Sequence, residues 1–333
     1  MLEPEIAAFI ERASALYPSH HAAMTPREQR DLYDRYAATL TPPLPSELTT
    51  QDANFRTDAG QAIPLRLYRH RAKASEHGTI RGTVLYFHGG GFVLGSLNSH
   101  QMVTARLAAD TGLDVIAVDY RLAPEHRAPA AHDDCLAITL AALNNRLPFD
   151  LPDHAGLQLA GDSAGGTLAA SVALRLRDDG VSGVRGVRGV ALVYPMLGTE
   201  PQLPARDTEA NAPMLTLADV HKFRNAYWGT VGGNSGERDE EYGDPTPGPA
   251  WTIPLAATRF DGLPPTLAIG AEHDPLRDDA RVFVERIREA GGDARLLIGT
   301  GLVHGCWRAL EASPGVQAMH RAVCDFLGEQ ARD

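Results

Sequence analysis

Apolar runs of strand length alternate with longer helical stretches through most of this chain, and this alternation restricts the fold more than any other feature. Such runs are followed by segments whose apolar residues recur at helical spacing. Short apolar runs separated by helices are typical of strands buried in a mostly parallel sheet. The runs lie at 84–87, 115–118, 157–160, 190–193 and 266–269.

Three other segments depart from this rhythm. Residues 63–68 alternate apolar and polar side chains, which predicts an antiparallel edge strand. Before residue 50, helical periodicity and the sequence Thr25-Pro26-Arg27-Glu28 predict two helices, the second opened by a capping box. Between 198 and 251 the rhythm is lost, apart from a helical pattern at 220–228 and a Gly/Pro-rich run at 243–249.

These departures predict an organisation in four parts. Residues 1–50 are expected to form N-terminal cap helices, and residues 199–251 an insertion that completes this cap. Residues 51–198 and 252–333 then form the two parts of the α/β core. A lid of this kind would lie over the carboxyl ends of the strands, where open α/β sheets bind ligands.

Composition excludes several classes of partner. With 44% hydrophobic and 22% charged residues among 333, the chain has the composition of an ordinary globular protein, and no apolar run is long enough for stable membrane insertion. A formal net charge of -11 argues against a nucleic-acid partner. The N-terminus lacks the basic and apolar regions of a secretory signal, so a cytoplasmic location is expected.

The three cysteines predict neither a disulfide framework nor a metal site. They are widely scattered, without the paired spacing or the histidine grouping of a zinc site. Free thiols are expected, and no metal or organic cofactor is expected. The cysteines are Cys135, Cys306 and Cys324.

A candidate nucleophile lies in the segment Gly161-Asp162-Ser163-Ala164-Gly165. The segment joins an expected strand to an Ala- and Leu-rich helical pattern. A sharp turn at this position would expose the Ser163 hydroxyl, and the small flanking residues would let strand and helix pack closely around it. A glycine-rich turn with a serine N-cap is the alternative.

The glycines in His88-Gly89-Gly90-Gly91-Phe92 follow another expected strand and favour an oxyanion hole. Consecutive glycines present backbone N–H groups without side chains in the way. Donors from Gly90, Gly91 and Ala164 would stabilise the charge that develops when Ser163 attacks a carbonyl. A phosphate-binding loop is the alternative, but the Gly-Lys-Ser/Thr or G-x-G-x-x-G context that it needs is missing.

The expected order of nucleophile, acid and base selects His304 as the general base. Only His304 and His320 follow every plausible acid, and His320 lies in a helical pattern, at its expected boundary. His304 is expected in a loop at 299–305, where it can reach a cleft. Asp274 is the preferred acid and Glu272 the runner-up.

Asp274 has an alternative role, because Asp274-Pro275 also reads as the N-cap and first residue of a helix. Asp278 and Asp279 would then lie in its first turn, where carboxylates are favourable. Capping does not prevent Asp274 from orienting the His304 ring.

Together these motifs resemble the hormone-sensitive-lipase-like family of bacterial esterases, also described as acetyl esterases or alpha/beta hydrolase fold-3 proteins. The resemblance implies an α/β-hydrolase fold with a mostly parallel central sheet and a helical cap. It assigns Ser163, Asp274 and His304 to a catalytic triad, and the three backbone donors above to the oxyanion hole. The matching segments are 88–92, 119–125, 161–166, 262–265, 274–278 and 304–305.

The function implied is hydrolysis of short-chain acyl esters of small molecules, and a homodimer is possible because family members are often dimers. Phe92, Trp228 and Trp251 are candidates for the substrate pocket, as is Cys306, which replaces the phenylalanine usual in the family. A ligand-binding protein without turnover, an acyltransferase and a peptidase are the competing hypotheses.

Overall fold

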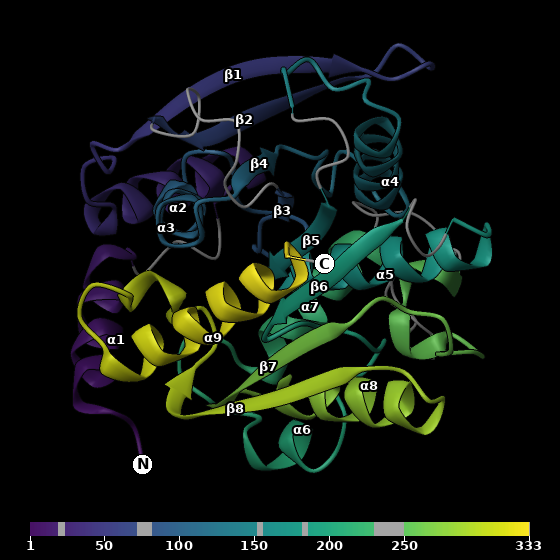
Figure 1. The fold of residues 1–333 in the computed structure, drawn as a ribbon. Helices are drawn as coiled ribbons and strands as arrows, with labels where there is room; N and C mark the ends of the chain where they lie inside the picture. The colour runs from purple at the N-terminus through teal and green to yellow at the C-terminus, as the bar shows by residue number, and fades with distance from the viewer. Residues whose placement is uncertain (19–23, 72–81, 152–155, 182–185, 230–249, 333) are drawn as a thin grey trace.

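A mixed eight-stranded sheet forms the centre of the molecule (Figure 1). The computed structural model describes residues 1–18, 24–71, 82–151, 156–181, 186–229 and 250–332. Within these ranges the strand order is β1-β2-β4-β3-β5-β6-β7-β8. The strands are β1 (Leu48–Arg56), β2 (Ala62–His70), β3 (Gly82–Phe87), β4 (Asp114–Val118), β5 (Gly156–Asp162), β6 (Val187–Val193), β7 (Thr266–His273) and β8 (Ala294–Val303).

Strands β3 to β8 are parallel, which confirms the sheet expected from the apolar runs. Strand β2 is antiparallel to β4, as predicted, but it does not form the edge of the sheet. That position belongs to β1, which pairs with β2 along its whole length. The edge assignment was wrong because β1 buries only Leu48, so its sequence lacks an apolar pattern.

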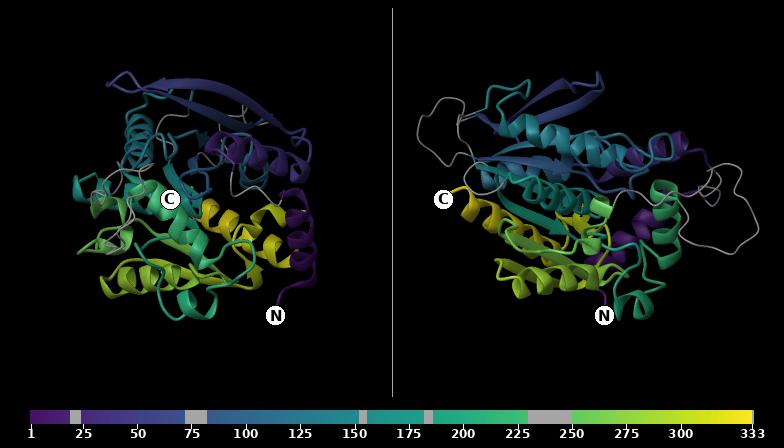
Figure 2. Two further views of the ribbon diagram at one scale, coloured as in Figure 1. Left: turned by 180° about the vertical axis from the view of Figure 1, so that it is seen from behind. Right: turned by 90° about the vertical axis from the view of Figure 1, so that its right-hand side faces the viewer.

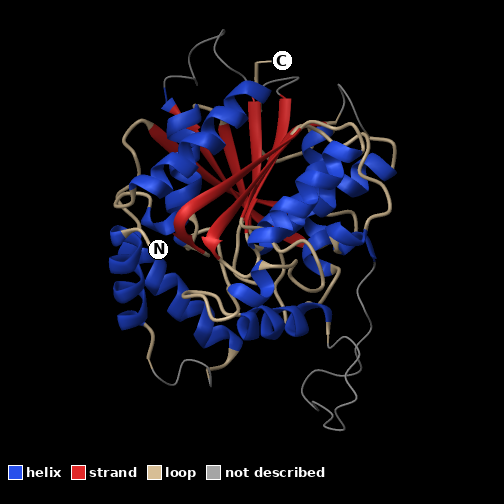
Figure 3. Cartoon of the chain, turned by 90° about the horizontal axis from the view of Figure 1, so that it is seen from below, coloured by secondary structure: helices blue, strands red, loops and turns tan. Residues whose placement is uncertain are grey.

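Helices cover both faces of the sheet, and strands appear between two helical layers in Figure 3. One core contains buried residues of α4, α5 and α8, and the other contains buried residues of α1, α3 and α9. Strand β3 divides its side chains between the two, with Leu85 in the first core and Val84 and Tyr86 in the second. The helices named here are α1 (Pro4–Leu16), α3 (Gln101–Thr111), α4 (Ala130–Leu143), α5 (Ala164–Asp178), α8 (Arg277–Glu289) and α9 (Pro314–Gln330).

The two N-terminal helices form as predicted. Helix α2 (Pro26–Leu40) begins with the expected capping box, in which Thr25 and Glu28 satisfy each other's backbone N–H groups. Of the later segment, the structure describes a short α6 (Ala205–Thr208) and α7 (Leu217–Trp228), whereas the Gly/Pro-rich run at 243–249 lies outside the described residues. Figure 2 (right) shows α1 and α2, in purple, near α7, in green. All three helices line one cavity at the carboxyl ends of the strands.

Short 3-10 turns complete the chain: η4 (Ala250–Thr252), η5 (Pro254–Ala256) and η6 (Cys306–Ala309). None of the helices in the described part of the chain combines the length and the apolar character needed to cross a membrane.

Candidate active site

Ser163 lies in a sharp turn between β5 and α5. Its backbone has φ 52° and ψ -121°, a conformation that a residue with a side chain rarely adopts. A Cβ atom added to Gly165 would lie 1.9 Å from the carbonyl oxygen of Phe87, and one added to Gly161 would lie 2.4 Å from the backbone of Gly165. The turn therefore needs both glycines.

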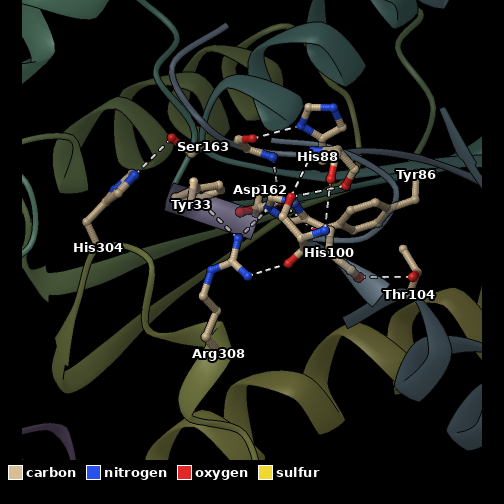
Figure 4. A network of polar contacts seen from close by, with 12 residues as sticks. Tyr33, Tyr86, His88, His100, Thr104, Asp162, Ser163, His304 and Arg308 are labelled. Carbon is tan, nitrogen blue, oxygen red and sulfur yellow. Dashed lines mark hydrogen bonds and ion pairs between the residues drawn. The ribbon is translucent and has the colours of Figure 1, made fainter. Parts of the chain in front are cut away.

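His304 contacts Ser163 on one side and Asp274 on the other. Its Nδ1 lies 2.7 Å from Asp274 Oδ2. Its Nε2 lies 2.9 Å from Ser163 Oγ (Figure 4). A carboxylate can only accept, so Nδ1 carries the proton and Nε2 is free to accept the hydroxyl proton of Ser163. Asp274 is fully buried and His304 is 8% exposed. The structure thus joins the three residues that the sequence singled out.

The local structure around this acid and base differs from the expectation in two ways. Helix α8 begins at Arg277 with Leu276 as its N-cap, so Asp274 is not the N-cap. Instead, Asp274 Oδ1 accepts the Leu276 N–H at 2.8 Å, which fixes the carboxylate while Oδ2 holds the imidazole. His304 follows β8 directly, because this strand continues to Val303 and replaces the expected loop.

Glu272, the alternative acid, makes a different hydrogen bond. Its Oε2 accepts the backbone N–H of Gly301 at 2.6 Å. Among the described residues no hydrogen bond joins Glu272 to His304, so the geometry favours Asp274.

Asp278 and Asp279 lie in the first turn of α8, as expected, but they also hold another segment. Asp279 accepts the backbone N–H groups of Leu197 and Gly198 at 2.7 and 3.1 Å. Asp278 accepts that of Ala205 at 2.8 Å. These contacts could not be predicted from the sequence, because they depend on how the segment after β6 folds back over α8.

The expected oxyanion donors face the same cavity as Ser163. Gly90 and Gly91 have φ values of 122° and 61°, and a Cβ atom on either would lie within 2.5 Å of Leu94 or Phe223. Within the described residues, no group accepts a hydrogen bond from the N–H of Gly90, Gly91 or Ala164. Backbone donors left free beside a serine hydroxyl suit a developing oxyanion.

A buried carboxylate that sequence reasoning did not single out supports this loop. Asp162 Oδ1 accepts the backbone N–H of Gly89 at 2.9 Å and the hydroxyl of Tyr86 at 2.6 Å (Figure 4). Burial alone would raise the Asp162 pKa, but His100, the Tyr86 hydrogen bond and Arg308 together hold it below its usual range. Asp162 is therefore an anion that ties the oxyanion loop to the residue before the nucleophile.

His88 anchors the start of the same loop and does not contact the triad. Its Nδ1 lies 2.8 Å from the Gly89 carbonyl oxygen, and its ring stacks on Tyr120 at 4.3 Å. Burial, followed by the nearby His100, lowers the His88 pKa to about 3. The ring is therefore neutral near pH 7, in agreement with a structural role.

Arg30 links helix α2 to the end of the oxyanion loop. Its Nε donates to the carbonyl oxygen of Val93 at 2.7 Å, and one terminal nitrogen donates to that of Ala123 at 2.7 Å. Both terminal nitrogens also contact the Glu125 carboxylate, at 3.0 and 2.7 Å. A single side chain thus holds a helix and two loops together.

The triad opens into a cavity of about 490 Å³. Phe92 is among its lining residues, as predicted, but Trp228, Trp251 and Cys306 are not. The Trp228 indole donates to Thr252 Oγ1 at 2.9 Å, and Trp251 packs edge-on against His132. Neither tryptophan is among the residues that line the cavity: Trp228 packs in the core against Phe92, and Trp251 is half-buried against His132.

Cys306 is also buried away from the cavity. Its side chain is fully buried, and burial raises the pKa of its thiol well above the ordinary value. The neighbouring Trp307 lines the cavity in its place.

Asp110, His320 and Cys324 form a group within the described residues that has the composition of a metal site. Trp307 Nε1 donates to His320 Nδ1 at 3.1 Å, so the imidazole proton lies on Nε2. That nitrogen donates to Asp110 at 2.9 Å and has no lone pair for a metal. His320 is therefore a buried hydrogen-bonding residue inside α9, within the helical pattern expected around it.

Comparison with known proteins agrees with this geometry. A family model described as alpha/beta hydrolase fold matches residues 84–308, which contain all three triad positions. The chain belongs to the hormone-sensitive-lipase-like alpha/beta hydrolases. Proteins with similar sequences carry the names esterase, carboxylesterase and acetyl esterase. Their similarity identifies this chain as an esterase.

Two relatives and one solved structure show how far the similarity extends. Esterase LipI of Mycobacterium tuberculosis is 37% identical over 224 residues, which cover 67% of this hydrolase and 64% of LipI. Carboxylesterase NlhH of the same organism is 34% identical over 271 residues, covering 80% of this chain and 78% of NlhH. The solved structure of ester-hydrolase EH1AB1, from the metagenome of Lake Arreo, superposes with a TM-score of 0.84 at 28% identity, covering 100% of both chains.

Proposed function

We propose that this chain hydrolyses short-chain carboxylic esters through a covalent acyl-enzyme. The observation that carries the proposal is the hydrogen-bonded chain from Asp274 through His304 to Ser163. These three side chains are connected to a cavity whose lining also includes Gly90, Gly91 and Ala164. The backbone N–H groups of these three residues have no acceptor among the described residues. An activated serine beside preorganised donors is the arrangement that acyl transfer requires.

In the acylation step, Ser163 Oγ attacks the ester carbonyl while His304 Nε2 takes the hydroxyl proton. Asp274 stabilises the resulting imidazolium and keeps the ring oriented. Gly90, Gly91 and Ala164 donate to the oxygen that becomes negative. Collapse of the tetrahedral intermediate breaks the bond to the alcohol, which leaves with the proton returned by His304.

In the deacylation step, a water molecule enters the place of the alcohol. His304 takes a proton from this water as it attacks the acyl carbonyl, and the same backbone donors stabilise the second oxyanion. Collapse then releases the carboxylic acid and returns the proton to Ser163. The enzyme is ready for another ester.

We further propose that residues 1–50 and 199–251 act as a cap that sets the acyl length. Support comes from α1, α2 and α7, which line the same cavity as Ser163 and His304. A cavity of about 490 Å³ lies at the small end of the range for small-molecule sites, which favours short acyl and alcohol groups.

The first test is hydrolysis of p-nitrophenyl butyrate by the purified protein. Ser163→Ala and Asp274→Asn are expected to lower kcat by about 10³-fold or more, because the nucleophile or the correct imidazole tautomer is lost. The exposed residues Ser46 and Asp58 provide matched controls as Ser46→Ala and Asp58→Asn. Full activity in a folded Ser163→Ala variant would exclude the proposed mechanism.

A profile of acyl length tests the substrate class separately. Esters from acetate to hexanoate are expected to react faster than the palmitate ester. A preference for palmitate would contradict the short-chain assignment without affecting the triad.

A further inference from the structure

Arg308 is a buried cation in the wall of the catalytic cavity. It follows His304 by four residues, is 9% exposed and lines the same cavity as Ser163. Its contacts are neutral groups: the Ser99 carbonyl oxygen, the Tyr33 hydroxyl and His100 Nε2. No carboxylate in the described part of the chain lies within ion-pair distance of its guanidinium. A buried charge without a direct counter-ion is costly, which makes this position unusual.

The guanidinium has hydrogen-bonding capacity left over. An arginine has five N–H donors, and the three contacts above use one N–H each. Figure 4 shows this side chain pointing toward Tyr33 and His100. The remaining donors have no partner among the described residues.

A second polar group beside Arg308 also lacks a partner. The hydroxyl of Tyr36 is buried and makes no hydrogen bond within the described residues, although Tyr36 lines the cavity and is only 3% exposed. The Arg308 Cζ atom lies 4.8 Å from the centre of the Tyr33 ring and 6.0 Å from that of Tyr36. Buried polar groups are rarely left unsatisfied unless a ligand or water completes them.

The charges around the cavity favour an anion. Its lining includes the cations Lys222 and Arg308, together with Arg224, which is ion-paired with Glu200. The lining also holds two carboxylates, and both accept hydrogen bonds from protein groups: Asp162 from Tyr86 and Gly89, and Asp219 from Thr216 in a capping box. Asp162 is the nearer charge to Arg308, but His100 makes the direct contact with the guanidinium. Positive groups in a cleft of low dielectric concentrate anionic ligands.

From these observations we infer that Arg308 and Tyr36 form a subsite for a carboxylate carried by the ester substrate. The inference rests on the proposed function and names its substrate class: esters with a free carboxylate on either the acyl or the alcohol part. The planar guanidinium fork suits a carboxylate, and the Tyr36 hydroxyl supplies a further donor.

The experiment compares pairs of esters that differ only in whether a terminal methyl is replaced by a carboxylate. On the acyl side, monoethyl malonate through monoethyl adipate are compared with ethyl propionate through ethyl hexanoate. On the alcohol side, acetoxyacetate and 4-acetoxybutyrate are compared with ethyl acetate and butyl acetate. Release of acid is followed at constant pH, and the ratio of kcat/KM values within each pair is the readout.

We expect at least one anionic ester to match or exceed its neutral partner, and the pair that does so locates the carboxylate on the acyl or the alcohol side. If the cavity offered no cation to the substrate, every anionic ester would react more slowly than its neutral partner. The inference is overturned if each anionic ester is more than about tenfold poorer than its partner, the range that a buried charged hydrogen bond controls. Hydrolysis of the neutral esters tests the proposed function independently.

Variants then assign the effect to the named residues. Arg308→Gln is expected to lower the ratio about tenfold to a hundredfold, as expected for losing a hydrogen bond to a charged group. Tyr36→Phe removes a hydroxyl that has no partner among the described residues, so it tests the subsite even if Arg308→Gln fails to fold. A severalfold fall in the ratio is expected.

Arg259→Gln is the control, because Arg259 is an exposed arginine paired with Asp261. This variant should keep the same ratio of kcat/KM values as the unmodified enzyme. An unchanged ratio in folded Tyr36→Phe and in every folded Arg308 variant would refute the subsite.

Discussion

The Asp162 carboxylate accepts the backbone N–H of Gly89 at 2.9 Å. Asp162, which directly precedes Ser163, thus holds Gly89, which directly precedes the expected oxyanion donors Gly90 and Gly91. Strands β3 and β5 are neighbours in the sheet, so this contact between the segments that follow them fixes the distance between the two halves of the proposed catalytic site.

Asp162→Asn is expected to lower kcat about tenfold or more, with little change in KM. An amide oxygen in the place of Oδ1 can still accept from Gly89 and Tyr86, but it is a weaker acceptor than a carboxylate, and the charge opposite His100 and Arg308 is lost. Steady-state kinetics with p-nitrophenyl butyrate give kcat and KM separately. A rise in KM at constant kcat would show that Asp162 does not position the oxyanion loop.

Gly165→Ala is expected to destabilise the protein by about 1–3 kcal/mol or more, because its Cβ would overlap the Phe87 carbonyl oxygen. Gly328→Ala in α9 is the matched control, since nothing lies within 4 Å of the added Cβ. A helical glycine replaced by alanine should gain about 0.5–1 kcal/mol. Urea denaturation measures both free energies of unfolding, and equal effects would contradict the close packing at the turn.

His132 is expected to make stability fall in mild acid. Burial lowers its pKa to about 3 from an ordinary value near 6.5. Between these values the unfolded chain binds a proton that the folded protein does not, so stability is lost as pH falls through this window. The slope is about 1.4 kcal/mol per pH unit.

The measurement is the free energy of unfolding at several pH values between 7 and 4. His132→Phe should reduce its pH dependence by about one proton, whereas replacing the exposed His126 by Gln should not reduce it to this extent. An identical pH dependence in His132→Phe and the unmodified protein would exclude His132 as the source.

The sheet and the triad geometry could be predicted because their signals are local. Parallel strands are buried on both faces and read as continuous apolar runs, and the turn at Ser163 needs glycines at fixed positions. The order of nucleophile, acid and base along the chain then left few candidates for the acid and the base. Strand β1 was missed because an exposed edge strand needs no apolar residues beyond Leu48.

The cavity could not be predicted, because its lining depends on packing between distant segments. Trp228 and Trp251 are aromatic residues in the expected insertion, yet Trp228 packs against Phe92 and Trp251 against His132, and neither lines the cavity. Arg308 carried no signal, since an arginine after an expected loop reads as exposed. Its burial appears only when α2 brings Tyr33 and Tyr36 against it.

Arg30 joins α2 directly to the Val93 carbonyl, two residues beyond Gly91. An ester too bulky for the cavity that displaced α2 would therefore also pull on the loop whose N–H groups are proposed to stabilise the oxyanion. We expect such a substrate to bind and then react slowly, so that a size limit would be seen in kcat more than in KM.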